Sequence, residues 1–305
     1  MERVLITGLS GFIGSNLHSR LEGKYEIYDL ECDLLDEEQV NSRLESVDPN
    51  YIIHLAARTE VEKSFYEQSS FSSVNYVGTV NIIEAARHLK NLKLFLFSST
   101  METYGWQPES DLIRDGYDLD YIRVFNEETP QNPNAPYAVA KVGCERYLEY
   151  AGRAYDFPYC ILRQTNTYGR SDNDFFVVEQ VITQMLKNPN EVNIGYKLPY
   201  RNFLWIDDLL NLYETILSKA DIAAGHVFCT GPANALSIEE LVNKIANKLN
   251  WTGTVNWDTK PKRVGEIYLL NSTPAKAKRL LGWEPTVELD TGLDMTIKIW
   301  RNKLV

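Results

Sequence analysis

Short apolar runs alternate with amphipathic stretches over the first half of the 305-residue chain. The apolar runs predict strands at 3–7, 25–29, 51–55, 93–98 and 158–163. The stretches between them carry apolar residues at helical spacing and predict helices near 12–22, 37–46, 72–90 and 136–155. Such an alternation of strand and helix is typical of an α/β protein with a doubly wound parallel sheet.

The pattern is less regular after about residue 165. It predicts helices at 175–187, 207–218, 237–249 and 273–282, and a strand at 202–206. We expect a first domain over residues 1–165, joined by a returning segment at about 200–235. Residues of about 166–199 and 236–305 would then form a smaller α/β lobe. That lobe would bind substrate at the carboxyl ends of the strands, where ligands bind in such sheets.

Three glycines, Gly8, Gly11 and Gly14, follow the first predicted strand and open the first predicted helix. Glycine permits a turn with positive φ, close approach of the backbone to a pyrophosphate, and tight packing of helix on strand. The helix that starts at Phe12 and Ile13 presents unpaired N–H groups and a positive dipole end to the phosphates. The segment therefore predicts a Rossmann-type domain that binds a dinucleotide.

Asp29 ends the second predicted strand, where a carboxylate accepts hydrogen bonds from the adenosine ribose. A carboxylate there repels the extra phosphate of NADP. Glu31 adds a second negative charge, and we expect no arginine nearby to offset the pair. The sequence therefore favours NAD as the cofactor.

Composition excludes several other classes of protein. The formal net charge of −11 disfavours a nucleic-acid surface, which requires a basic stripe. No apolar run reaches the ~18 residues that span a bilayer, and no signal-peptide pattern precedes the first strand. The four cysteines are far apart and contain no CxxC pair, so we expect reduced thiols and a cytoplasmic protein. The four histidines have no metal-ligand spacing, so we expect no metal. We interpret His54 as a packed strand histidine.

A candidate catalytic pair lies in YAVAK, where Tyr137 and Lys141 are one helical turn apart and share a face. A phenol ordinarily has a pKa near 10, and a neighbouring ammonium together with a nicotinamide cation lowers it. Tyr137 would then exchange a proton with a substrate hydroxyl. The segment FSSTMETYG delivers Ser98 and Thr100 to the end of the fourth strand, where Thr100 can bond the same oxygen.

Together these elements resemble the extended short-chain dehydrogenase/reductase family, the NAD-dependent epimerases and dehydratases of nucleotide sugars. TGLSGFIGSNL is similar to the family's TGGxGFIGSxL, and HLAA, SVNYVGTVNIIEAAR and PYAVAK match further motifs. Later, RQTNTYGR is similar to RxxNVYGP. PYRNFLWIDDLL resembles RDFxxVDDxxxA, and KRVGEIYLLNSTPAKAKRLLGWEP resembles RPGDxxxxxxDxxKAxxxLGWxP. The resemblance covers nearly the whole chain.

The resemblance implies a set of binding residues. Those expected to contact NAD are Gly8, Gly11, Phe12, Ile13, Gly14, Asp29, Asp33, Leu34, Leu55, Ala56, Ala57, Asn75, Ser98, Tyr137 and Lys141. Those expected to contact the nucleotide-diphosphate sugar are Thr100, Asn166, Arg201 and Arg263, since arginines form bidentate bonds with phosphate. The resemblance also implies a homodimer through the helices near 75–90 and 137–152, with Val80, Ile83 and Leu148 as candidate contacts.

Family members share oxidation at carbon 4 of the sugar and then diverge. Glu102, two residues after Thr100, is similar to the base of 4,6-dehydratases, which removes the proton on carbon 5. Met101 departs from that pattern, because many dehydratases carry there an Asp that protonates the leaving hydroxyl. Because Glu102 matches the dehydratase pattern, we rank dehydration first in spite of Met101, and 4-epimerisation second. Further alternatives are reduction of a 4-keto sugar, favoured by the short link from Asp29 to Asp33, decarboxylation, and a non-catalytic NAD-sensing protein.

The segment between Trp106 and Pro136 is longer and more acidic than its counterpart in the family. It is a candidate lid over the sugar, a dimer contact or a solvated loop. A solvated loop is the default expectation for such a connection.

Overall fold

The computed structural model describes residues 1–117, 122–260 and 265–304. Its centre is a six-stranded sheet in the order β10-β5-β4-β3-β1-β2, with every neighbouring pair parallel. The strands are β1 (Arg3–Thr7), β2 (Glu26–Asp29), β3 (Tyr51–His54), β4 (Leu94–Thr100), β5 (Tyr159–Gln164) and β10 (His226–Cys229). The five predicted strands and the doubly wound parallel sheet are confirmed. Strand β10 was not predicted.

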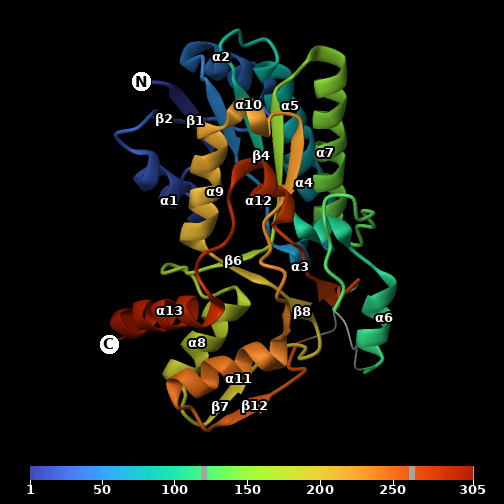
Figure 1. The fold of residues 1–305 in the computed structure, drawn as a ribbon, viewed down its shortest axis with the longest axis vertical. Coiled ribbons are helices and arrows are strands. Elements are labelled where there is room, and N and C mark those ends of the chain that lie inside the picture. Colours follow the sequence, from blue (N-terminus) through green and yellow to red (C-terminus); the bar gives the residue numbers. More distant parts are fainter. Residues whose placement is uncertain (118–121, 261–264, 305) are drawn as a thin grey trace.

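Helices cover both faces of this sheet (Figure 1). Val4 and Ile6 of β1 share a core with α1 (Phe12–Leu21) and α9 (Ile206–Ser218). Leu5 faces the opposite core, which is formed with α2 (Glu37–Val47), α5 (Gly78–Ala86) and α7 (Pro136–Tyr155). Alternate residues of a strand point to opposite faces, so a strand buried on both sides is apolar throughout.

The helix predicted over 72–90 is not a regular α-helix throughout, and it starts and ends earlier than predicted. Helix α4 (Gln68–Ser72) passes into one π-helical turn at Ser73–Val77, and α5 follows and ends at Ala86. The hydroxyl of Thr79 donates to the carbonyl oxygen of Asn75 at 2.6 Å, and the Cys144 thiol donates to the same oxygen at 3.1 Å. These side chains satisfy a carbonyl that the wider turn removes from the regular pattern.

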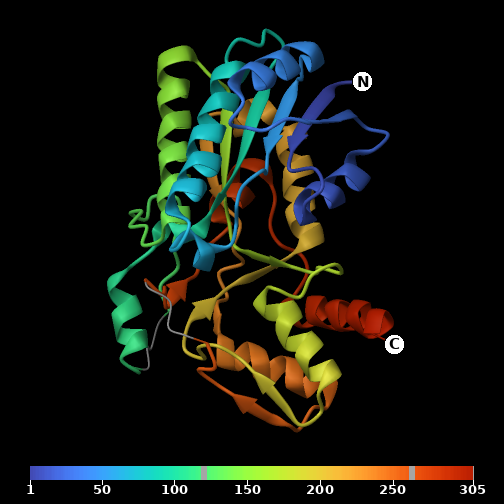
Figure 2. The same cartoon turned by 180° about the vertical axis from the view of Figure 1, so that it is seen from behind.

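A smaller lobe lies beyond the carboxyl ends of the strands (Figure 2). Its helices are α8 (Val177–Lys187), α11 (Ile238–Leu249) and α13 (Leu289–Leu304), of which α13 was not predicted. Short strands pair within it: β6 (Asn166–Tyr168) with β9 (Phe203–Trp205), β7 (Glu191–Asn193) with β12 (Thr254–Asn256), and β8 (Tyr200–Arg201) with both β11 (Leu236–Ser237) and β13 (Leu269–Leu270).

Three short helices complete the description. Helix α3 (Val61–Ser64) follows β3, and α10 (Ala220–Ala223) follows α9. Helix α12 (Ala275–Leu281) contacts α10 and β10, so this late segment lies against the large sheet. Of the helices in the described ranges, none is both long and apolar enough to cross a bilayer.

The long acidic connection is not simply a solvated loop. It contains α6 (Pro108–Arg114), and Phe125 is fully buried with its ring centroid 5.2 Å from that of Tyr104. The Phe125 N–H donates to the carbonyl oxygen of Asn271 at 2.6 Å, and Thr273 N–H donates back to Phe125 at 3.0 Å. The default expectation is therefore wrong for this part, because distant segments pair with its backbone. Residues 118–121 lie outside the described residues.

Loss of the Phe125 ring should destabilise the fold. We expect Phe125→Ala to lower the free energy of unfolding by about 3–5 kcal/mol, because the ring is fully buried. The control Tyr117→Ala removes a ring that is 65% exposed in the same connection. It should change the free energy of unfolding by less than about 0.5 kcal/mol. Urea unfolding of the two variants measures both values. Equal effects would show that Phe125 is not a core residue.

Candidate active site

The glycine turn after β1 is built so that no side chain fits. Gly8 has a φ of +72°, and a Cβ there would lie 3.0 Å from the backbone nitrogen of Ala56. A Cβ on Gly14 would lie 2.3 Å from the carbonyl oxygen of Gly8. The turn thus holds the start of α1 directly against the end of β1. Gly11, which precedes α1, makes no side-chain cap, so the first N–H groups of the helix remain available to a ligand.

A cavity of about 610 Å³ begins at this turn and runs along the carboxyl ends of the strands. Most residues predicted for cofactor and catalysis line it, together with the predicted substrate-binding residue Asn166. They are Gly8, Gly11, Phe12, Ile13, Gly14, Leu55, Ala56, Ala57, Ser98, Thr100, Glu102 and Tyr137. A second cavity of about 240 Å³ continues into the smaller lobe and includes Arg201 and Lys260. Glu102 and Asn166 line both cavities and so mark where they join.

Tyr137 and Lys141 lie in the first turns of α7, against the end of β4. Burial raises the pKa of the Tyr137 phenol above 10; the Glu102 carboxylate raises it further, while a hydrogen bond with Thr100 lowers it. The Lys141 ammonium donates to the carbonyl oxygen of Ser98 at 2.7 Å and lies 4.6 Å from the centroid of the Phe97 ring. The structure therefore brings Thr100, Glu102 and Tyr137 together on the cavity wall, whereas Lys141 is buried one turn further along α7 and is not part of the cavity's described lining.

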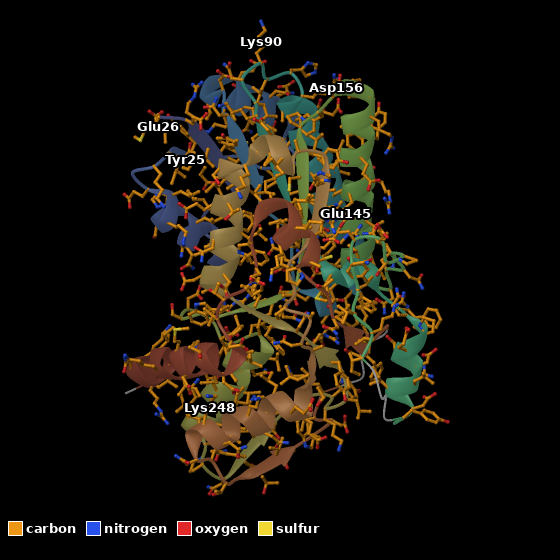
Figure 3. All side chains as sticks on the ribbon, in the orientation of Figure 1. Tyr25, Glu26, Lys90, Glu145, Asp156 and Lys248 are labelled. Carbon is orange, nitrogen blue, oxygen red and sulfur yellow. The ribbon has the colours of Figure 1, made fainter. Side chains whose placement is uncertain are left out.

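A buried ion pair positions this helix. Glu145 follows Lys141 by one turn and lies on the side of α7 that faces the sheet (Figure 3). Its carboxylate pairs with Arg163 of β5 at 2.8 Å and accepts hydrogen bonds from Ser99 at 2.5 Å and Gln131 at 2.8 Å. The side chains of Glu145 and Arg163 are 0% and 3% exposed. A buried charge pair persists only when its remaining polar atoms are satisfied, as they are here.

His54 is a structural residue, which confirms the interpretation from the sequence. It is fully buried, and burial lowers its pKa to about 3, so the ring is neutral. Its ring nitrogens bond the hydroxyls of Thr7, at 2.7 Å, and Thr79, at 2.9 Å. Since Thr79 donates its proton to Asn75, His54 donates to Thr79 from Nε2 and accepts from Thr7 at Nδ1.

The expectation that no arginine lies near Asp29 is wrong. Arg43 of α2 donates from Nε and Nη2 to the backbone carbonyl oxygen of Asp29, at 3.1 and 2.9 Å. Its Nη2 also lies 2.6 Å from the Glu31 carboxylate. The two elements meet because α2 runs back along the end of β2. Glu31 thus neutralises the one arginine that contacts Asp29 among the described residues.

Other predicted contacts have roles within the fold. Asn75 exchanges two hydrogen bonds with the backbone of Arg58, at 2.8 and 2.9 Å, and so shapes the loop after β3. Asp33 accepts from the N–H of Leu35, and the carbonyl oxygen of Leu34 accepts from Asn81. Within the described part of the chain, the large cavity's lining includes none of Asp29, Asp33, Leu34 and Asn75.

The predicted diphosphate-binding residues lie in different places. Asn166 lines both cavities. Arg201 lines the second cavity, and its guanidinium donates to the carbonyl oxygen of Ile267 at 2.7 Å and lies 3.3 Å from Glu266. Arg263 lies outside the described residues.

Sequence reasoning gave no role to Glu145, which supports the site, or to Arg170, which lines it. Glu145 continues the face of Tyr137 and Lys141 at the same four-residue spacing, and that periodicity was the available signal. Arg170 lines the large cavity, and its only signal was that the resembling motif ends in proline where this chain has arginine.

Comparison with known proteins identifies the family. A family model described as GDP-mannose 4,6 dehydratase matches residues 24–296, most of the chain. The chain belongs to that family. Its members are NAD(P)-dependent dehydratases and epimerases of nucleotide sugars.

Individual relatives carry both kinds of name. A dTDP-D-glucose 4,6-dehydratase of Dictyostelium discoideum is 30% identical over 276 residues, which cover 81% of this chain and 62% of that protein. A putative UDP-glucose 4-epimerase of Methanocaldococcus jannaschii is 27% identical over 325 residues, 98% of each chain. The crystal structure of a Thermotoga maritima UDP-glucose 4-epimerase with UDP-glucose has a TM-score of 0.86 at 27% identity, over 99% of this chain and 100% of that one.

The buried Lys141 ammonium should make stability depend on pH. Burial lowers its pKa from 10.5 to about 8, so between these values the unfolded chain holds a proton that the folded chain has released. The free energy of unfolding of the wild type, minus that of Lys141→Met, should therefore rise by about 1–3 kcal/mol from pH 8 to pH 10.

Urea titrations across that range measure this difference. The matched control is Lys90→Met, which removes an exposed ammonium at the far end of the molecule (Figure 3) and should give a constant difference. A flat profile for Lys141→Met as well would contradict the burial of its charge.

Proposed function

We propose that this chain is an NAD-dependent enzyme that oxidises a nucleotide-diphosphate sugar at carbon 4 and then eliminates water between carbons 5 and 6. The observation that carries the proposal is the place of Glu102. Its carboxylate lies close enough to Tyr137 to raise the phenol pKa, and it lines both cavities where they join. A base at that junction is beside the sugar carbon next to the one that Tyr137 serves.

The large cavity fits a dinucleotide. The glycine turn is a cradle that a Cβ at Gly8 or Gly14 would fill, and the start of α1 supplies N–H groups without a side-chain cap. Leu55, Ala56 and Ala57 supply the wall that continues from the turn. When bound, NAD takes up hydride from carbon 4 and returns it to the sugar.

Different residues of the chain carry out the two proton transfers. Tyr137 takes the proton of the carbon-4 hydroxyl, with Thr100 bonded to the phenol and the Lys141 ammonium stabilising the phenolate. The resulting ketone acidifies the proton on carbon 5, which Glu102 removes as hydroxide leaves carbon 6. Hydride then returns to carbon 6 and Glu102 gives a proton back to carbon 5. The hydroxide and the proton that Tyr137 took make up the water that is lost. Because the phenol pKa is raised in the protein alone, Tyr137 stays protonated until a cationic ring adjoins it.

A specific observation favours 4-epimerisation as the second candidate. Met101 is 2% exposed, and its thioether cannot protonate a leaving hydroxyl. An epimerase needs no such acid, because the same hydride returns to carbon 4.

We further propose a homodimer through the helices near 75–90 and 137–152. Ile83 and Leu148 are fully buried within the single chain, so they belong to its core and not to this contact. Exposed apolar side chains lie on the same two segments instead: Tyr76, Val77, Val139 and Tyr150, at 36–54% exposure.

The proposed preference for NAD rests on Asp29 and on the neutralisation of Arg43 by Glu31. Glu31→Gln frees the guanidinium for the extra phosphate of NADP. We expect the affinity for NADP relative to NAD to rise about two- to five-fold, the range of an exposed ion pair. Isothermal titration of both dinucleotides measures the ratio. The control is Glu26→Gln at the start of β2, which should leave the ratio unchanged (Figure 3). A ratio unaltered by Glu31→Gln would contradict the account of Arg43.

Mass spectrometry in deuterium oxide tests the proposed reaction with purified protein, NAD and a panel of nucleotide hexoses. A dehydratase gives a product lighter by one water with deuterium at carbon 5, whereas an epimerase gives an isobaric product without deuterium. Turnover of a 4-keto sugar alone, in a parallel assay with NADH or NADPH as the reductant, would indicate a reductase, and no turnover in either assay would favour the NAD-sensing alternative.

Glu102→Gln separates the steps of the reaction. We expect it to slow elimination about 10²–10⁴-fold while oxidation at carbon 4 continues, because only the carbon-5 proton transfer is lost. Tyr137→Phe should abolish both steps. Glu128→Gln, on the exposed part of the long connection, is the matched control and should leave the rates unchanged. If the Glu102→Gln variant eliminates water at the wild-type rate, Glu102 is not the base.

A further inference from the structure

Arg170 is held between two aromatic rings on the wall of the large cavity. Its guanidinium carbon lies 4.3 Å from the ring centroid of Phe12, the first residue of α1, and 3.9 Å from that of Phe176, just before α8. The residue is 8% exposed. The two rings pack against the guanidinium, and its N–H donors are the groups that can bind a ligand.

These donors are incompletely satisfied by the protein. Nη1 donates to the carbonyl oxygen of Thr167 and lies 3.6 Å from Oε1 of Glu179. This Oε1 already accepts from the backbone N–H groups of Gly169, at 2.9 Å, and Arg170, at 3.0 Å. Buried Nε of Arg170 and buried Oε2 of Glu179 have no hydrogen-bond partner among the described residues. Buried donors without acceptors are rare in folded proteins and indicate a missing partner.

The surroundings indicate an anion as that partner. Arg170 contacts the first residue of α1, so a full positive charge adjoins the positive end of a helix whose first N–H groups have no side-chain cap. Both line the cavity that contains Gly8, Gly11 and Gly14. Arg201 and Lys260 line the second cavity, whose described lining does not include Arg170.

We propose that Arg170 binds the pyrophosphate of the dinucleotide together with the glycine turn. This role rests on the proposed function, since it requires that the large cavity takes the cofactor. In-plane donors of a guanidinium match two phosphate oxygens, and the Phe12 and Phe176 rings hold the plane fixed. The pyrophosphate thus has a side-chain cation in addition to backbone N–H groups.

Isothermal titration of the full chain with three ligands tests the proposal. NAD and ADP-ribose contain the pyrophosphate, whereas adenosine does not. We expect Arg170→Gln to weaken NAD and ADP-ribose about 10- to 100-fold, as for loss of a charge-assisted hydrogen bond, and to leave adenosine unchanged. Arg170→Lys should retain part of the affinity. The matched control is Arg87→Gln, which removes a surface arginine that lies 4.9 Å from the Tyr155 ring centroid; its affinities should equal those of the wild type.

Several outcomes would overturn the role. Wild-type affinity of Arg170→Gln for ADP-ribose does so directly. Equal loss of adenosine shows a structural role, and loss of the nucleotide sugar alone assigns Arg170 to the substrate. Because Arg170 is buried, circular dichroism is used to check the fold of each variant. If Arg170→Gln does not fold, Arg170→Lys becomes the test variant. Wild-type affinity of Arg170→Lys for ADP-ribose, with unchanged salt dependence, overturns the proposal. A wild-type protein that binds no dinucleotide overturns the proposed function itself and this role with it.

Discussion

The buried pair of Glu145 and Arg163 fixes α7 against β4 and β5, and the candidate chemistry depends on that fixed position. Glu145 also holds Ser99, the residue before Thr100, and one turn earlier Lys141 binds the carbonyl oxygen of Ser98. Tyr137 and Thr100 come from two elements, and the proposed reaction requires them to meet at one substrate oxygen, so a small slide of α7 would separate them. Removing one member of a buried pair typically costs about 3–5 kcal/mol, so this registry is strongly enforced.

In the protein without a ligand, the electrostatics of the same site favour the neutral forms of Tyr137 and Lys141. Burial and the Glu102 carboxylate both raise the Tyr137 pKa, and burial lowers that of Lys141 to about 8. Each effect favours the neutral form of the catalytic group. In the proposed reaction, a cation beside the phenol would reverse this balance, so the positive ring of bound NAD would supply both the oxidant and the charge that activates Tyr137 as a base. Proton transfer would then depend on the presence of the cofactor.

Features carried by local patterns were predictable from the sequence. The glycine turn, the strand ends and the four-residue spacing of Tyr137 and Lys141 each depend on neighbours in the chain. What sequence reasoning missed depends on distant segments. Arg43 reaches Asp29 only because α2 folds back along β2, Phe125 is buried by residues near Asn271, and Arg170 meets Phe12 across two lobes. The π-helical turn at Ser73–Val77 likewise receives a hydrogen bond from a thiol of α7.

Transfer of a label from carbon 4 tests the central claim that Tyr137, Thr100 and Lys141 promote oxidation at that carbon. The enzyme with NAD is given nucleotide hexoses that carry deuterium at carbon 4, and NMR identifies the position of the deuterium in each product. The account predicts that the deuterium stays in the sugar, at carbon 6 after dehydration or at carbon 4 after epimerisation. Product formed with that deuterium lost to water would contradict it, because the carbon-4 hydrogen would then leave as a proton and not as hydride.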